Sequence, residues 1–362
     1  MQLCCIIESG QEMRKGRYIA GLLIGLLILA AALAGCGSVE EEPEKLAVKV
    51  LVLPKFEIGE FTADVPGEAQ YYFEEYMQGC DTYEVEGCEE PLQLYYKDGV
   101  AMCMLGQGKV SAAINTMAVL SDTRFDFSDA YVISTGCAGV AKGYGVLGDV
   151  FIVTAVEDYD LGHNADPREM TENSETTWFH IPEYDEIGCA KLDPQLTEKV
   201  FNLVKDEPLA TTEESGRYMA ECFPGEEWAA RGPQVLKGTG ATSDNYWKGE
   251  FDHKNALLIT ETYGCPDPFA VTEMEDIAIA RVLRKLGMLD RLIIIRDAVN
   301  MDVFAPGSTP ESLWGAEAGI ESTAELTSDL SSEEYIDIFP VAMENNFKVG
   351  QKIITAILNG EL

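Results

Sequence analysis

The sequence predicts an α/β fold in which helices cover both faces of a single sheet. The first observation is the run 47–53, AVKVLVL, because a continuous β-branched and apolar run is typical of a strand buried on both faces. The second is that such runs alternate with segments that have apolar residues at helical spacing. The composition, 46% hydrophobic and 24% charged over 362 residues, is that of a globular protein. We therefore expect one domain with insertions rather than two domains.

The individual elements follow from these patterns in chain order. Apolar runs predict strands at 47–53, 100–105, 131–134, 149–156, 234–237, 256–260 and 291–296. Apolar residues at helical spacing predict helices at 110–120, 272–286 and 331–359. Polar side chains and glycines follow several of these strands, at the edge where open α/β sheets bind ligands.

The N-terminal residues have the layout of a secretory signal. A short basic segment, 13–17, precedes an apolar run at 19–34 that is shorter than the roughly 18–20 residues a membrane-spanning helix needs. Leu33-Ala34-Gly35-Cys36 resembles the lipobox of bacterial lipoproteins, in which the cysteine carries the lipid. We expect a signal peptide at 1–35 and lipidation of Cys36.

The segment that follows predicts a tether and a location. Residues 36–46 are acidic and contain a proline, which is typical of a solvated linker. The folded domain is then expected at 47–362, outside the cell membrane and anchored to it by the lipid on Cys36. The formal net charge of −36 makes nucleic acid an improbable partner, because phosphate backbones need a basic surface.

The cysteines and histidines favour a disulfide over a metal. Cys80 and Cys88 flank a glycine-containing acidic loop and could close a small disulfide in an oxidising exterior, although the sequence does not fix the pairing of the cysteines. The sequence has no CxxC pair and its three histidines stand far apart, so no zinc site is predicted. The loop Gly106-Gln107-Gly108-Lys109 is followed by Val110 rather than Ser or Thr, which excludes a Walker phosphate loop. No cofactor is expected.

Motifs at the ends of the predicted strands resemble a known superfamily. They are Phe56-Glu57, the segments 105–113, 135–139, 147–150 and 242–245, Thr272-Glu273-Met274-Glu275, and 295–300. Taken in this order they resemble the nucleoside phosphorylases and nucleosidases. Segments 158–169 and 242–247 are similar to the group within it named purine nucleoside permeases. The resemblance implies a three-layer sandwich with a mixed central sheet, a purine nucleoside as ligand, and a homo-oligomer.

The resemblance also implies where the nucleoside binds. Met274 and Glu275, beside Glu273, match a Met-Glu pair in which the methionine packs on the sugar and the carboxylate accepts hydrogen bonds from both ribose hydroxyls. The alternative for these acids is a helix first turn favoured by its dipole. Cys137, Ala138 and Gly139 match the turn beside the base and ribose.

The catalytic groups are also implied by resemblance. Asn300 falls where related enzymes carry Asp or Asn near N7 of the purine, and Glu57 or Glu60 falls where nucleosidases carry the carboxylate that activates water. An amide can only hydrogen-bond the departing base, whereas a carboxylic acid can protonate it. Asn300 therefore suggests recognition of 6-oxopurines or a slower catalyst. The alternative is an Asn that caps the following turn.

Two departures from the family pattern concern phosphate. Phosphorolytic relatives carry serine at the Cys137 position and arginine at the Ser134 position, so the phosphate site is weakened here. Arg296, Lys142 or Arg168 could compensate, which leaves phosphate open as a co-substrate. Two functions remain: cleavage of the N-glycosidic bond by water or phosphate, or capture of nucleosides for a separate transporter. The chain is not expected to transport alone, because a channel needs spanning helices or a barrel.

Overall fold

The structure of the protein is a computed structural model that describes residues 44–62, 64–88, 90–310 and 338–362. The predicted signal peptide at 1–35, the predicted lipidation site Cys36 and most of the predicted tether lie outside the described residues. The unit described below spans Lys45–Leu362 and is compact. In the described part of the chain, no helix combines the length and apolar character that crossing a membrane requires.

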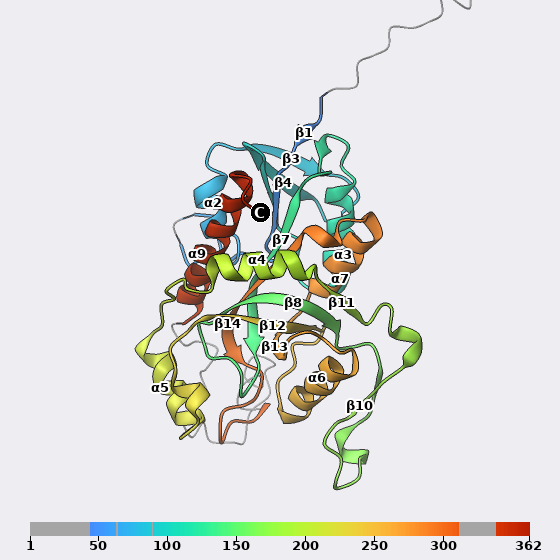
Figure 1. Ribbon diagram of the computed structural model, residues 1–362, viewed down its shortest axis with the longest axis vertical. Helices are drawn as coiled ribbons and strands as arrows, with labels where there is room; N and C mark the ends of the chain where they lie inside the picture. The colour runs from blue at the N-terminus through green and yellow to red at the C-terminus, as the bar shows by residue number, and fades with distance from the viewer. Residues whose placement is uncertain (1–43, 63, 89, 311–337) are drawn as a thin grey trace, which may run out of the picture. The chain divides into compact units, whose positions relative to one another are not determined.

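A mixed sheet forms the centre of the fold (Figure 1). Its strand order is β11-β8-β12-β13-β7-β2-β5-β4-β3, and β14 pairs with both β7 and β8. The strands are β2 (Val50–Leu53), β3 (Asp81–Val85), β4 (Leu92–Lys97), β5 (Val100–Cys103), β7 (Tyr131–Val140), β8 (Val150–Asp158), β11 (Cys189–Lys191), β12 (Val235–Thr242), β13 (Phe269–Glu273) and β14 (Leu292–Met301).

The strand directions confirm the mixed sheet. Strand β2 pairs parallel with β5 and β7, and β14 pairs parallel with β7. Strand β13 is antiparallel to β7, and β14 is antiparallel to β8. The loops that follow β2, β5 and β13 and the middle of β7 and β14 consequently converge on one region.

Helices cover both faces of the sheet, as predicted, and α9 (Ile338–Leu358) contributes to the buried clusters on both. Val50 and Val52 of β2 belong to one buried cluster and Leu51 and Leu53 to the other, because successive side chains of a strand point to opposite faces. Full burial of each such side chain contributes about 1.5–3 kcal/mol. The Val50 face packs on α2 (Gln70–Tyr76), α4 (Pro194–Val204) and α9, and the Leu51 face packs on α3 (Lys109–Leu120) and α7 (Asp276–Leu286).

One predicted strand is wrong. Residues 256–260 belong to the helix α6 (Glu250–Thr262), not to the sheet. Its buried residues include His253, Ala256 and Thr260, which are three and four apart, whereas Leu257 is 44% exposed. That spacing is helical, and a five-residue apolar run cannot distinguish a strand from a buried helix face.

The helix predicted at 272–286 begins later than expected. Residues up to Glu273 form strand β13, and α7 begins at Asp276. The remaining described elements are α5 (Glu213–Cys222), the short strands β1 (Leu46–Ala47), β6 (Phe125–Asp126), β9 (His163–Asn164) and β10 (Trp178–Phe179), and single turns at 167–169, 182–184, 227–230 and 289–291.

The Cys80–Cys88 disulfide that the sequence allowed is not formed, because both cysteines are free thiols. The five residues of β3 lie between them and are extended. At about 3.3 Å per residue, the five residues of β3 span roughly 16 Å, and Cys88 follows the far end of that strand. A disulfide needs Cα atoms within about 7 Å.

Candidate active site

The loops at the end of the parallel strands enclose a cavity of about 560 Å³. It brings together seven of the residues predicted from the sequence, and these come from β7, from the β13–α7 junction and from β14. They are Cys137, Ala138, Gly139, Glu273, Met274, Glu275 and Asn300. The cavity is also lined by residues that the sequence analysis did not assign to the nucleoside, including Lys55, Phe56, Glu68, Gln107, Tyr246, Thr272, Arg296, Val299, Ile338 and Phe339.

Glu275 is held with its carboxylate at the cavity. Its Oε1 accepts a hydrogen bond from the backbone N–H of Gly108 at 3.0 Å, and its Oε2 accepts one from Arg296 Nη2 at 3.2 Å. Gly108 has φ +85°, a conformation that favours glycine. The Gly106–Lys109 turn therefore positions a carboxylate rather than a phosphate.

Glu273 has a structural task at the start of α7. Its Oε2 accepts hydrogen bonds from the backbone N–H groups of Glu275 and Asp276, both at 2.7 Å, and Thr242 donates its hydroxyl to Oε1. Burial and the neighbouring Asp276 raise the pKa of Glu273 to about 7, while Arg296 opposes that rise. Glu273 thus fixes the backbone that carries Glu275.

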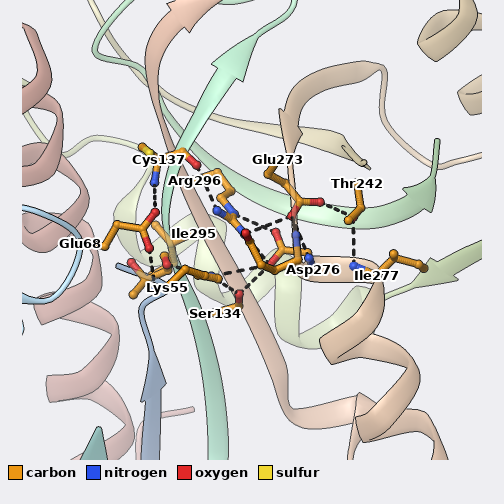
Figure 2. A network of polar contacts seen from close by, with 12 residues as sticks. Lys55, Glu68, Ser134, Cys137, Thr242, Glu273, Asp276, Ile277, Ile295 and Arg296 are labelled. Atoms are coloured by element: carbon orange, nitrogen blue, oxygen red, sulfur yellow. Dashed lines mark hydrogen bonds and ion pairs between the residues drawn. The ribbon is translucent and has the colours of Figure 1, made fainter. Parts of the chain in front are cut away.

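Arg296 joins the carboxylates of this region into one cluster (Figure 2). Its guanidinium lies 3.1 Å from Glu273, 3.2 Å from Glu275 and 2.8 Å from Asp276, and it also donates to the carbonyl oxygen of Cys137. The residue is 1% exposed. We call Glu273, Glu275, Asp276 and Arg296 the Glu275 cluster.

Lys55 is a buried cation that the sequence analysis missed. Its ammonium donates to Ser134 Oγ at 2.7 Å and to the carbonyl oxygen of Thr135 at 2.8 Å, and Ser134 donates to Asp276 Oδ1 at 2.6 Å. Burial and the nearby Arg296 lower the pKa of Lys55. The ammonium therefore lies beside Ser134, the position where phosphorolytic relatives are expected to carry arginine.

Glu68 is the second carboxylate at the cavity. Its Oε1 accepts from the backbone N–H of Cys137 at 3.0 Å and its Oε2 from that of Lys55 at 2.7 Å. A Cβ on Gly136, which has φ +149°, would lie 2.1 Å from Glu68 Oε1, so a glycine is needed there. Burial raises the pKa of Glu68, and Lys55 and Arg296 oppose that rise.

Glu57 and Glu60 are not brought to the cavity, which corrects the expectation that one of them faces the nucleoside. The Glu57 carboxylate accepts hydrogen bonds from the backbone N–H groups of Gly67, Ala69 and Gln70 at the start of α2. Glu60 is exposed on the loop that follows. Glu57 consequently anchors the loop that delivers Glu68.

One end of the cavity, formed by β7 and β14, has no charged side chain among Cys137, Val299 and Asn300. Asn300 is buried, and its Nδ2 donates to the carbonyl oxygen of Met301 at 3.1 Å. Burial and the neighbouring Glu68 and Asp297 raise the pKa of the Cys137 thiol well above its usual value, so the thiol is neutral. With Val299 these residues form what we call the Asn300 end, which is neutral and largely apolar.

The cations predicted from the sequence as candidates for an anion site are all paired with carboxylates of the protein. Lys142 pairs with Glu250 at 2.5 Å and Arg168 pairs with Asp166 at 2.5 Å, and neither lines the cavity. Arg296 is engaged by three carboxylates. Among the described residues, no group of three or more His, Cys, Asp or Glu side chains could hold a metal ion.

Comparison with solved structures defines the class of fold. The chain superposes on a 5′-methylthioadenosine/S-adenosylhomocysteine nucleosidase of Helicobacter pylori, solved with butyl-thio-DADMe-Immucillin-A, with a TM-score of 0.51 and 13% identity. That match covers 86% of this chain and 100% of the other. The same nucleosidase from Streptococcus pneumoniae gives a TM-score of 0.50 at 14% identity, over 86% and 100%. The fold is that of the nucleoside phosphorylases and nucleosidases.

Within this fold the chain belongs to the purine nucleoside permease family, whose model matches residues 47–361. A probable purine nucleoside permease of Schizosaccharomyces pombe is 23% identical over 280 residues, which cover 70% of this chain and 74% of that protein. A 5′-methylthioadenosine/S-adenosylhomocysteine nucleosidase of Bacillus pumilus is 29% identical over 203 residues, covering 56% and 69%.

Proposed function

We propose that the protein hydrolyses the N-glycosidic bond of purine nucleosides. The observation that carries the proposal is a pair of buried carboxylates, Glu68 and Glu275, at one cavity. Its two cations among the described residues are both engaged by protein groups. Such a cavity offers an acceptor for ribose and a base for water, and it leaves little positive charge for phosphate. The nucleosidase-like relatives support the same chemistry.

Glu275 accepts hydrogen bonds from the 2′- and 3′-hydroxyls of the ribose in this proposal. A carboxylate suits adjacent hydroxyls because it offers two acceptor oxygens in one plane. Each carboxylate oxygen already accepts one hydrogen bond, Oε1 from the Gly108 N–H and Oε2 from Arg296, and these bonds fix the plane of the group. The remaining lone pairs are available to the sugar, with Met274 lining the same wall.

Glu68 activates the attacking water. A general base works best when its pKa lies near the operating pH, and burial shifts the pKa of Glu68 upward in that direction. Its carboxylate is fixed by two backbone N–H groups and therefore needs little reorganisation when it accepts a proton.

Asn300 binds the purine and stabilises the departing base by hydrogen bonding. As an amide, Asn300 has no acidic proton to transfer to the base, but its N–H group can donate a hydrogen bond. The site therefore suits 6-oxopurines, whose N7 and O6 accept hydrogen bonds. Val299, Phe339 and the neutral Cys137 add the apolar surface that a base ring requires.

Phosphorolysis is disfavoured by charge. Glu68, Glu273 and Glu275 line the cavity together with only two cations, Lys55 and Arg296, among the described residues. A phosphate dianion would have to displace the Glu275 cluster from Arg296, or Ser134 and Thr135 from Lys55. Water meets no such competition.

The purified protein, incubated with inosine, guanosine and adenosine, with and without phosphate, tests the proposal. We expect free base to accumulate, fastest from the 6-oxopurine nucleosides, as measured by chromatography. Absence of free base under every condition, with or without phosphate, would exclude an enzyme of this class.

Capture of nucleosides without cleavage is the second candidate. It is favoured by Asn300, which lacks an acidic proton for the leaving base, and by the permease family to which the chain belongs. Nucleosides would then raise the melting temperature while remaining intact, and a separate transporter would take them up.

We also propose that the domain acts outside the cell membrane, anchored through Cys36. The support is the sequence pattern of residues 13–36. Cys36→Ser should release the protein from membranes, because an acidic surface gives no electrostatic attraction to anionic lipid. Retention of the variant on membranes after a high-pH wash would contradict the anchor.

Self-association of the protein is a further part of the proposal. It is supported by two apolar side chains on α3, Val110 and Ile114, which are exposed by 62% and 39%. Sedimentation of the purified protein measures the oligomeric state.

A further inference from the structure

Two cysteines face each other at the edge of the sheet, away from the cavity. Cys189 begins the edge strand β11, and Cys265 follows the C-terminus of α6. Their sulfur atoms lie 3.7 Å apart although the residues are 76 positions apart in the chain. Both are half-buried free thiols.

The surroundings of the two thiols are polar and enclosed. Glu157 of β8 is opposite Cys189 in the ladder and fully buried; its Oε2 accepts from Thr260 at 2.9 Å and lies 3.9 Å from Cys265 Sγ. Its Oε1 has no hydrogen-bond partner among the described residues. Burial raises the pKa of Glu157 well above its usual value, so the group is a neutral acid beside the thiols.

We propose that Cys189 and Cys265 form a disulfide when the protein meets a small-molecule disulfide such as oxidised glutathione. The Cys189 thiolate attacks one glutathione sulfur, which forms a mixed disulfide and releases one glutathione thiolate. Cys265 then loses its proton and attacks the Cys189 sulfur, which releases the second glutathione thiolate. Two electrons pass from the cysteines to glutathione, and the two protons of the cysteine thiols end on the two glutathione thiols.

The chemistry assigns different tasks to the two thiols. The hydrogen bond from the Cys265 thiol lowers the pKa of Cys189, whereas the same contact and burial raise the pKa of Cys265. Cys189 is therefore the attacking thiol and Cys265 the resolving one. The thiolate is the nucleophile in such an exchange.

The disulfide would fasten one specific segment. Residues 159–188, which include β9 and β10, leave the sheet after β8 and return at β11. The bond would tie that return point to the loop between α6 and β13. The disulfide would close a loop of chain between residues 189 and 265. Closing such a loop restricts mainly the unfolded chain, so we expect the melting temperature to rise by roughly 5–10 °C on oxidation.

Peptide mapping of the full protein after equilibration with oxidised glutathione tests the proposal without any variant. Trypsin places Cys189 in peptide 169–191 and Cys265 in peptide 255–281, each with a single cysteine. Cys80 and Cys88 fall together in peptide 56–97, which serves as an internal control. We expect a linked 169–191/255–281 pair that disappears on reduction. Both peptides remaining fully alkylated would overturn the proposal.

Variants separate the bond from general effects of oxidation. Cys189→Ser and Cys265→Ser should each abolish the oxidation-dependent rise in melting temperature, whereas Cys80→Ser should retain it. Cys189→Ser should also prevent glutathione attachment at 265, and Cys265→Ser should trap glutathione on Cys189. An equal rise in all three variants would assign the effect to other thiols and contradict the proposal.

Discussion

The Glu275 cluster and the Glu68 region are two ways of holding a carboxylate at one cavity. Glu275 lies two residues from Glu273 and is fixed by a buried guanidinium that three carboxylates share. Glu68 lies on a loop and is fixed by two backbone N–H groups, and the positive charge of Lys55 opposes the rise in its pKa. The first arrangement comes from a short local motif, and the second depends on the tertiary fold.

That difference carries over to chemistry. The Glu275 cluster is rigid and charged, which suits recognition of hydroxyl groups that do not react. The Glu68 carboxylate is desolvated and has a raised pKa, which suits proton transfer. Recognition and reaction are therefore separable by mutation, and the following changes test that separation in order of expected effect.

Glu68→Gln should produce the largest loss. Removing a general base lowers turnover by about 10²–10⁴-fold. Nucleoside binding, followed by thermal shift, should change little because Glu275 is untouched. Glu60→Gln, an exposed glutamate on the preceding loop, is the matched control and should keep full activity. Equal activity of the Glu68 and Glu60 variants would remove Glu68 from the mechanism.

Glu275→Gln should weaken the reaction of ribonucleosides more than that of 2′-deoxyribonucleosides. A hydrogen bond to a charged acceptor is worth about 1.5–3 kcal/mol, or roughly 10- to 150-fold in kcat/KM. The 2′-deoxynucleoside, which lacks one hydroxyl partner, is the control. The same loss for both sugars would place Glu275 away from the ribose.

Asn300→Asp should shift base preference toward adenine. A carboxylic acid can donate a proton to N7, and its other oxygen can accept a hydrogen bond from the 6-amino group that only adenine carries. Release of adenine should therefore rise by about tenfold or more relative to hypoxanthine. Rates for adenosine and inosine measured on both proteins give this ratio. An unchanged ratio would argue that Asn300 only supports its own turn through Met301.

Lys109→Met should cause a smaller loss through the turn that carries Gly108. The Lys109 ammonium pairs with Asp158 at 2.8 Å and Asp160 at 2.6 Å, and its backbone N–H donates to Asp244 at 2.7 Å. Releasing this clamp should raise KM by about 3- to 10-fold with less change in kcat, because only a positioning contact is lost. Lys142→Met, which removes a surface ion pair, should leave KM unchanged; an equal rise there would indicate a general effect of charge.

Asp297→Asn should affect the pH dependence of stability and barely change activity. Burial raises the pKa of Asp297 to about 8, while Asn346 donates to its Oδ1 and opposes the rise. Between roughly pH 4 and pH 8 the folded state then holds a proton that the unfolded state has lost, so the free energy of unfolding falls as pH rises.

The substitution should flatten that fall by at most about 1.4 kcal/mol per pH unit. Urea unfolding of both proteins between pH 5 and pH 8 measures the difference. Parallel pH profiles would show that Asp297 does not titrate in this range.

Much of the Glu275 cluster could be predicted from the sequence because its residues are neighbours in the chain. Thr272–Glu275 and 295–300 stand at the ends of two strands, and the fold brings strand ends to one edge. The apolar runs likewise predicted most of the central sheet. The prediction of a strand at 256–260 was wrong because its apolar residues belong to the buried face of helix α6.

Glu68 could not be predicted, because nothing local distinguishes it from Glu57 and Glu60. The resemblance left Glu57 and Glu60 as alternatives, and the Glu57 carboxylate instead accepts hydrogen bonds from the backbone at the start of α2. Only the close approach of the loop to Gly136 reveals Glu68 as the group at the cavity. Lys55 was missed for the same reason, since its burial beside Ser134 depends on two adjacent strands.

The central claim is that water, not phosphate, attacks the nucleoside, and the identity of the sugar product tests it most directly. The protein is incubated with inosine over a range of phosphate concentrations, and ribose and ribose 1-phosphate are separated and quantified. Hydrolysis predicts ribose at a rate that does not depend on phosphate. Ribose 1-phosphate at a rate that rises and saturates with phosphate would contradict the account, and would mean that Lys55 or Arg296 leaves its protein partners to bind the anion.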